Sequence, residues 1–266
     1  MRDWDDEFDN GGHIPGSAEL PGKWMQDAAA YRASGVRVEE HAYGAHPRAR
    51  FDLVHPDGAS NGLAVFVHGG YWIKTEKAMW THFAEGARAA GWTVCMVQYT
   101  LAPEARIAEI TQQVGAAINA AAQQVAGPVR IAGHSAGGHL VSRMVCSDSP
   151  LARDVQARLA RCVSISGLHD LRPLMNTKMN AQQRIDAAEA RTESAALLEP
   201  LPGVPVTAWV GGGERPEFIR QSRLLGLMWE GLGTQVEVVV DGAHDHFSVL
   251  DDLRVPGTPL THAWVG

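Results

Sequence analysis

One serine lies within a run of small residues, GHSAG at 133–137, that matches the pattern G-x-S-x-G. An apolar run precedes this pentapeptide and a second one follows, so the sequence predicts a strand, a tight turn and a helix. Glycines two residues to either side are needed because a Cβ there would collide with the neighbouring strand and helix. Such a turn exposes the hydroxyl beside the free N–H groups of a helix, where developing negative charge is stabilised. Ser135 is therefore a candidate nucleophile, although the pattern also fits a helix-capping serine.

A serine hydroxyl is a weak nucleophile at neutral pH. Ser135 would need a histidine to accept its proton and an acid to orient that histidine. After a strand-turn-helix nucleophile of this kind, the order along the chain is serine, acid, histidine. Downstream, the acids at predicted strand ends are Asp170 and Glu214, and His244 and His246 follow the last predicted strand. The order of these residues therefore suits a catalytic triad.

Two choices stay open within this order. Glu214 is favoured over Asp170 because it ends the turn VGGGE directly after a predicted strand, whereas Asp170 could cap a helix. Glu217 is a weaker candidate, since it falls inside the next predicted helix. His246 is preferred over His244 because an adjacent phenylalanine can anchor its loop in the core. We expect no metal and no cofactor, since the two histidines lack a third ligand at usable spacing.

A second glycine-bearing turn, HGGYW, follows another apolar run. Acyl transfer creates an oxyanion that needs preorganised hydrogen-bond donors. We expect these donors to be the backbone N–H groups of Gly70, Tyr71 and Ala136, with Gly69 allowing a close approach of the backbone. His68 is expected to tether this loop rather than to react.

Composition limits the possible classes of protein. The chain has 266 residues, 45% hydrophobic and 20% charged, which suits one large α/β domain with a substantial core. The net charge of -7 and the lack of a basic stripe argue against a nucleic-acid partner. No apolar run is long enough to span a bilayer, and the N-terminus is acidic, so we expect a cytoplasmic protein without a membrane partner. The oligomeric state is not readable from the sequence.

The cysteines agree with that compartment. Cys95, Cys146 and Cys162 are an odd number and are far apart in sequence, and two of them lie in apolar runs. Buried free thiols fit this pattern better than a disulfide framework or a zinc site.

Apolar runs alternate with helical patterns through most of the chain. This alternation predicts a single α/β domain, 1–266, with a mostly parallel sheet, helices on both faces and an antiparallel pair at its start. Ligands of such sheets bind at the carboxyl ends of the strands. The expected strands are 36–42, 49–54, 63–67, 92–98, 129–132, 162–166, 205–210 and 235–240. The expected helices are 24–33, 77–90, a long one within 103–126, one after Ser135, and 216–232.

Two segments lie outside this alternation. An N-terminal extension, 1–35, carries Trp4, Phe8 and Trp24, which could roof a pocket or could pack on the surface. The segment 171–204 is polar and helical, and we expect it to be a small lid inserted at the carboxyl edge of the sheet.

Several motifs together resemble the kynurenine formamidase (arylformamidase) group of α/β-hydrolases over about residues 60 to 250. These are HGGYW, GHSAG, SGLHDLRPL, ERPEF and the pair His246-Phe247. The resemblance implies an α/β-hydrolase fold and the hydrolysis of N-formyl-L-kynurenine to kynurenine and formate, a step of tryptophan degradation, without a metal. Family members bear Asp or Glu at the acid position, so Glu214 is acceptable there. The three glycines before Glu214 are a departure.

The size of the acyl group offers a physical argument in the same direction. A formyl group is the smallest acyl unit, and Tyr71 and Trp72 beside the expected oxyanion donors would crowd a larger one, unless both side chains simply pack in the core. A short-chain carboxylesterase with the same machinery is the alternative, and a non-catalytic small-molecule binder is the third hypothesis. Arg172, Asn180 and Arg215 are candidates for holding an amino-acid head group.

Overall fold

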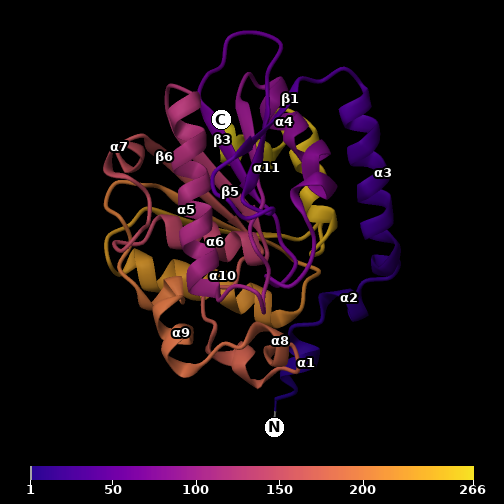
Figure 1. Cartoon of the computed structure of the whole chain (residues 1–266). Coiled ribbons are helices and arrows are strands. Elements are labelled where there is room, and N and C mark those ends of the chain that lie inside the picture. The colour runs from indigo at the N-terminus through magenta and orange to yellow at the C-terminus, as the bar shows by residue number, and fades with distance from the viewer. Residues whose placement is uncertain (1) are drawn as a thin grey trace.

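The computed structural model describes residues 2–266, and its centre is an eight-stranded sheet with the order β1-β2-β4-β3-β5-β6-β7-β8 (Figure 1). β1 and β2 form an antiparallel hairpin, β2 pairs antiparallel with β4, and every other pairing is parallel. Each predicted strand is therefore present, and the antiparallel start of the sheet is confirmed. The strands are β1 (Val38–Ala42), β2 (Arg50–Val54), β3 (Leu63–Val67), β4 (Thr93–Val97), β5 (Val129–His134), β6 (Leu159–Ile165), β7 (Val206–Gly211) and β8 (Val236–Asp241).

The central strands are apolar on both sides because both faces of the sheet are covered. All five residues of β3 are buried, and its side chains alternate between two cores. Val65 and Val67 join the core under α5 (Ile107–Gln124), α6 (Ala136–Met144) and α10 (Pro216–Glu230).

Ala64 and Phe66 face the opposite core, which lies under α3 (Leu20–Ala33) and α11 (Pro259–Val265). In Figure 1, α5 and α10 accordingly lie on one side of the sheet and α3 on the other.

Three predicted helices differ in detail from the observed ones. The helix expected at 24–33 begins at Leu20, because proline at the second position is tolerated in a first helical turn. Residues 77–90 form a 3₁₀ helix, η2 (Lys77–Ala84), and then a short α4 (Glu85–Ala89). The long helix α5 begins only at Ile107, where the Glu109 side chain accepts the Arg106 N–H at 2.7 Å and caps the first turn.

The remaining elements are short. Before α3 come α1 (Trp4–Glu7), α2 (Asn10–His13) and η1 (Ser17–Glu19). α7 (Arg153–Gln156) precedes β6, and η5 (Ser248–Arg254) precedes α11. The segment 171–204 holds η3 (Arg172–Asn176), α8 (Asn180–Gln183), α9 (Ala187–Thr192) and η4 (Ala195–Leu197).

The first N-terminal helix, α1, meets the segment 171–204 at one end of the molecule, where α1 and α8 are neighbours in Figure 1. The Lys178 backbone N–H donates to Asp5 Oδ1 at 2.7 Å across this contact.

Two further expectations concern membranes and thiols. Among residues 2–266, no helix is both long and apolar enough to cross a bilayer. Cys95, Cys146 and Cys162 are free and buried, as predicted. Burial raises the pKa of each thiol, so none of the three is an activated nucleophile.

Candidate active site

Ser135 lies at the sharp turn between β5 and α6. Its backbone angles, φ 55° and ψ -117°, are unusual for a residue with a side chain. A Cβ at position 133 would collide with the Gly137 carbonyl, and one at position 137 would collide with the Val67 carbonyl. The two glycines of the motif are therefore steric requirements of this turn, as the sequence predicted.

His246 and Glu214 form a buried pair beside this turn. His246 lies in the loop after β8 and Glu214 in the turn after β7, and His246 Nδ1 lies 2.6 Å from Glu214 Oε2. A carboxylate only accepts hydrogen bonds, so in the neutral imidazole Nδ1 carries the hydrogen and Nε2 carries the lone pair. No hydrogen-bond partner of Nε2 is present among residues 2–266. The pair thus has the tautomer that a general base requires.

Several donors converge on the Glu214 carboxylate, which is fully buried. Oε1 accepts the Gly211 N–H at 2.8 Å and the Ser166 hydroxyl at 2.5 Å. Oε2 accepts the Asn10 amide at 3.4 Å in addition to His246. The glycine-rich turn that departs from the family pattern therefore supplies a backbone donor to the acid.

The other candidates for the acid and the base lie elsewhere. Asp170 accepts two bonds from the Arg172 guanidinium, at 2.8 and 3.0 Å. Glu217 pairs with Arg220 at 2.6 Å. His244 Nδ1 contacts Ser248 Oγ at 3.3 Å and has no contact with Glu214. The structure thus brings together the preferred acid and the preferred base.

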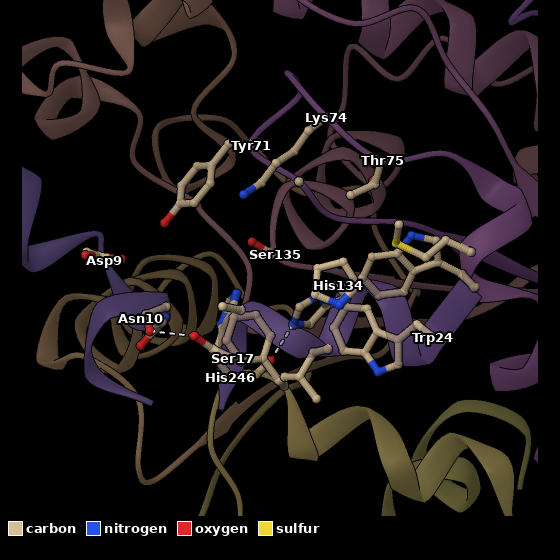
Figure 2. Close-up of a pocket in the computed structure, with 18 of the residues that line it drawn as sticks. Asp9, Asn10, Ser17, Trp24, Tyr71, Lys74, Thr75, His134, Ser135 and His246 are labelled. Carbon is tan, nitrogen blue, oxygen red and sulfur yellow. Dashed lines mark hydrogen bonds between the residues drawn. The ribbon is translucent and has the colours of Figure 1, made fainter. Parts of the chain in front are cut away.

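Ser135 and His246 line one cavity of about 450 Å³ (Figure 2). Pockets that bind small organic ligands have volumes in this range, roughly 300–1,000 Å³. One part of the wall is apolar and mostly aromatic, and another part is polar. The apolar part includes Phe8, Leu20, Pro21, Trp24, Met79, Trp80 and Phe247, and the polar part includes Asp9, Asn10, Ser17, Lys74 and Thr75.

The loop that begins with His68 contacts the nucleophile turn. A Cβ at Gly69 would lie 3.0 Å from Ser135 Cβ, so a side chain there would crowd the serine. Gly70 and Tyr71 line the cavity, and neither backbone N–H has an acceptor among residues 2–266. His68 Nδ1 lies 2.8 Å from the Gly69 carbonyl oxygen and 3.0 Å from Thr75 Oγ1, contacts that suit its expected tethering role.

The aromatic residues of this loop point in different directions. The Tyr71 side chain lines the cavity, and its hydroxyl donates to the Phe8 carbonyl oxygen at 2.5 Å. Trp72 is instead fully buried in the core, with its ring 5.1 Å from that of His139. Our expectation that both aromatics crowd the acyl group is therefore wrong for Trp72, because the left-handed backbone of residues 71 and 72 turns the chain back on itself.

Of the two segments that the sequence offered as a cover, the N-terminal extension lines the cavity and the expected lid does not. Phe8 and Trp24 of the N-terminal extension line it, whereas Trp4 does not. No residue of 171–204, the predicted lid, contributes to its wall. That segment instead contacts the backbone of Tyr71, since Gln183 Nε2 donates to the Tyr71 carbonyl oxygen at 3.3 Å.

Sequence reasoning did not identify three residues that hold the acid and the base. Asn10 and Ser166 donate to Glu214, and His134 Nε2 donates to the His246 carbonyl oxygen at 2.8 Å. Burial, aided by His246, holds the pKa of His134 well below its usual value, so its ring is neutral. Position at a strand end could have drawn attention to Ser166, but no sequence signal singles out Asn10.

The residues proposed for a substrate's amino-acid head group do not line the cavity. Arg172 pairs with Asp170, and Arg215 pairs with Asp6. Asn180 hydrogen-bonds the backbone of residue 185. Among residues 2–266, no cluster of three or more His, Cys, Asp or Glu side chains could hold a metal ion.

Comparison with known proteins gives a consistent picture. A family model described as the alpha/beta hydrolase fold matches residues 64–246. A kynurenine formamidase of Danio rerio is 28% identical over 220 residues, which cover 79% of this chain and 75% of that protein.

Solved structures extend the comparison. A crystal structure from Silicibacter sp., provisionally named a thioesterase, is 41% identical with a TM-score of 0.94 and covers 100% of both chains. Esterase B of Lactobacillus rhamnosis has a TM-score of 0.67 at 17% identity, covering 92% of this chain and 90% of its own, which is a likeness of fold alone. The formamidase relative agrees with the resemblance carried by the HGGYW and DLRPL segments.

Proposed function

This chain belongs to the α/β-hydrolase fold family, and from that premise we propose that it is a serine hydrolase that removes the formyl group from N-formyl-L-kynurenine. The observation that supports this most is the His246–Glu214 pair at 2.6 Å beside Ser135 on a single cavity. Similarity to kynurenine formamidases names the substrate class.

The proposed reaction has two halves. His246 Nε2 takes the proton of Ser135 Oγ as this oxygen attacks the formyl carbon. The C–N bond then breaks, and the aryl amine leaves with the proton from His246. In the second half, His246 takes a proton from water, the hydroxide attacks the formyl-serine ester, and formate leaves as Ser135 regains its proton. Glu214 orients the imidazole and stabilises its charged form throughout.

The proposed oxyanion hole consists of the backbone N–H groups of Gly70, Tyr71 and Ala136. Ala136 is the first residue of α6, so its N–H has no partner within the helix. Within residues 2–266, the N–H groups of the other two residues have no hydrogen-bond acceptor, and both residues line the cavity. Together these donors would stabilise the charge on the former carbonyl oxygen.

The choice of a formyl group depends on Tyr71. Its ring lines the cavity next to the proposed donors and is held there by the bond from its hydroxyl to Phe8. An acyl group with several carbons would compete with that ring for space, whereas a formyl hydrogen would not.

A comparison of substrates tests this proposal. We expect kcat/KM for N-formyl-L-kynurenine to exceed that for an aryl butyrate ester and for a butyryl thioester of a small thiol. A preference for either butyryl substrate would contradict the formamidase assignment and would leave a serine hydrolase of another substrate class.

Hydrolysis of short esters or thioesters is the second candidate function. Esters, thioesters and formamides all pass through a tetrahedral intermediate, so the same three side chains would serve. The name of the structure from Silicibacter sp. favours this candidate. A cytoplasmic location, a small-molecule substrate, and the lack of nucleic-acid and membrane partners remain predictions.

A further inference from the structure

Two charged side chains line the cavity, Asp9 and Lys74. All other lining residues of this cavity are apolar, polar without charge, or histidine. Neither Asp9 nor Lys74 has an ion-pair partner within 4.0 Å among residues 2–266. The buried lysine and arginine of the described residues are by contrast both paired, Lys77 with Asp52 at 2.6 Å and Arg143 with Asp148 at 2.7 Å.

The backbone explains why Lys74 reaches the cavity. The N–H groups of Ile73 and Lys74 both donate to the Gly70 carbonyl oxygen, at 3.0 and 3.1 Å, so the chain turns back directly after the proposed oxyanion residues. This turn places the lysine beside Tyr71. In Figure 2 the Lys74 amine extends toward Tyr71, on the same side of the site as Ser135.

Asp9 reaches the same cavity from the N-terminal extension. Its Oδ1 accepts the Gly12 N–H at 2.8 Å and caps α2, which holds the side chain in place while Oδ2 has no hydrogen-bond partner among residues 2–266. Burial raises the pKa of the Tyr71 phenol, and the negative charges of Glu214 and then of Asp9 raise it further, so the Asp9 carboxylate lies near that ring. The cavity therefore presents one cation and one anion near a shared aromatic ring.

From this arrangement we infer that Lys74 and Asp9 form the subsite for a zwitterionic α-amino-acid head group. Lys74 binds the carboxylate and Asp9 binds the ammonium, while the aryl ring of the substrate lies against the aromatic part of the wall. Both side chains are exposed at the cavity mouth, so the head group stays partly in water and the formamide lies deeper, at Ser135.

This inference rests on the proposed function for its substrate class, but its physical basis is separate. An esterase for simple aliphatic substrates needs no unpaired charge in its cavity, because such a charge adds desolvation cost when an apolar ligand binds. A pair of opposite unpaired charges suits a ligand that bears both signs. A phosphate group of a thioester carrier would use Lys74 alone.

The test compares two formamides that differ only in the head group. N-formyl-L-kynurenine has the amino-acid head group, and 2-formamidoacetophenone has the same ring, ketone and formamide without it. The measured quantity is the ratio of kcat/KM for the first compound to that for the second, in wild type, Lys74→Met and Asp9→Asn. Asn also caps helices well, so D9N removes the charge while α2 keeps its cap. Lys23→Met is the control, since Lys23 is exposed and does not line this cavity.

We expect the ratio to fall about tenfold in K74M and in D9N, as losing a hydrogen bond between charged groups typically does, and to stay at the wild-type value in K23M. An unchanged ratio in K74M would overturn the inference.

A second measurement keeps the inference testable if the enzyme does not hydrolyse formamides at all. N-formyl-L-kynurenine is then assayed as a competitive inhibitor of aryl acetate hydrolysis. A Ki that rises about tenfold in K74M supports the subsite even if the formamidase proposal fails. A wild-type enzyme that N-formyl-L-kynurenine does not inhibit, or a Ki equal in wild type and K74M, contradicts it.

Discussion

The Glu214 carboxylate is held by its neighbours on both oxygens. One oxygen receives a backbone N–H and a hydroxyl, and the other faces His246 and the Asn10 amide. Asp170, the competing acid, is held in a similar way, but by the arginine two residues away. The two acids therefore differ in whether a histidine lies within reach rather than in burial, since both are buried.

Replacing each acid separately tests this difference. We expect Glu214→Gln to lower kcat by roughly 10³- to 10⁴-fold, because the amide cannot hold the imidazole in the required tautomer or stabilise its charge. Asp170→Asn is the matched control. D170N should lower the urea midpoint of unfolding, because the bonds from Arg172 to Asp170 are weakened, while kcat changes less than about threefold. If D170N were as inactive as E214Q, the assignment of Glu214 as the triad acid would be contradicted.

Ser135 can be tested by covalent labelling. An organophosphate should add one phosphoryl group to the wild-type protein, and mass spectrometry of peptides should locate it at Ser135. Ser135→Ala should lose both the label and activity, by roughly 10⁴-fold or more. Labelling of another serine at the same rate would remove Ser135 from the mechanism.

At the scale of elements, the N-terminal extension forms part of the site as well as its cover. Asn10, in α2, accepts the Arg215 N–H at 2.7 Å and donates to Glu214. Phe8 packs edge-on against Phe218 of α10, and its carbonyl oxygen accepts the Tyr71 hydroxyl. Residues from the beginning of the chain thus hold the acid turn and the Tyr71 ring.

Asn10→Ala should lower kcat by roughly tenfold, because it removes one donor to the acid and one acceptor from the turn that carries it. Asn119→Ala is a suitable control, since Asn119 of α5 also donates one hydrogen bond and accepts another, both with the backbone of the loop at 150–152, and does not line the cavity. The measurements are kcat and melting temperature for both variants. A loss of melting temperature without a loss of kcat in N10A would mean that the extension only stabilises the fold.

At the scale of the whole molecule, buried histidines link stability to pH. Burial lowers the pKa of five of them below the ordinary value of 6.5, to about 4 for His68 and His82 and to about 3 for His139 and His169, with His134 also well below it. Below pH 6.5 the unfolded chain therefore binds protons that the folded chain does not bind. The free energy of unfolding must fall as the pH falls from 6.5 toward 4, and each histidine contributes at most about 1.4 kcal/mol per pH unit.

Urea unfolding at pH 7.5, 6.0 and 5.0 measures this effect. The midpoint should change little above pH 6.5 and should decrease steeply between pH 6.0 and 5.0. A midpoint that is constant across this range would show that the buried histidines are protonated in the folded protein.

The sequence by itself determined the strands of the sheet, the nucleophile turn and the order of serine, acid and histidine. These features depend on near neighbours in the chain: an apolar run makes a buried strand, and a turn with Ser135 at positive φ excludes side chains at positions 133 and 137. Tertiary structure alone decided which acid meets His246, that Trp72 packs inward, and that residues 8–24 rather than 171–204 line the cavity.

The physical reason is the separation along the chain. The bond between Asn10 and Glu214 joins residues 204 positions apart, so it depends on how a whole segment packs and not on any local pattern.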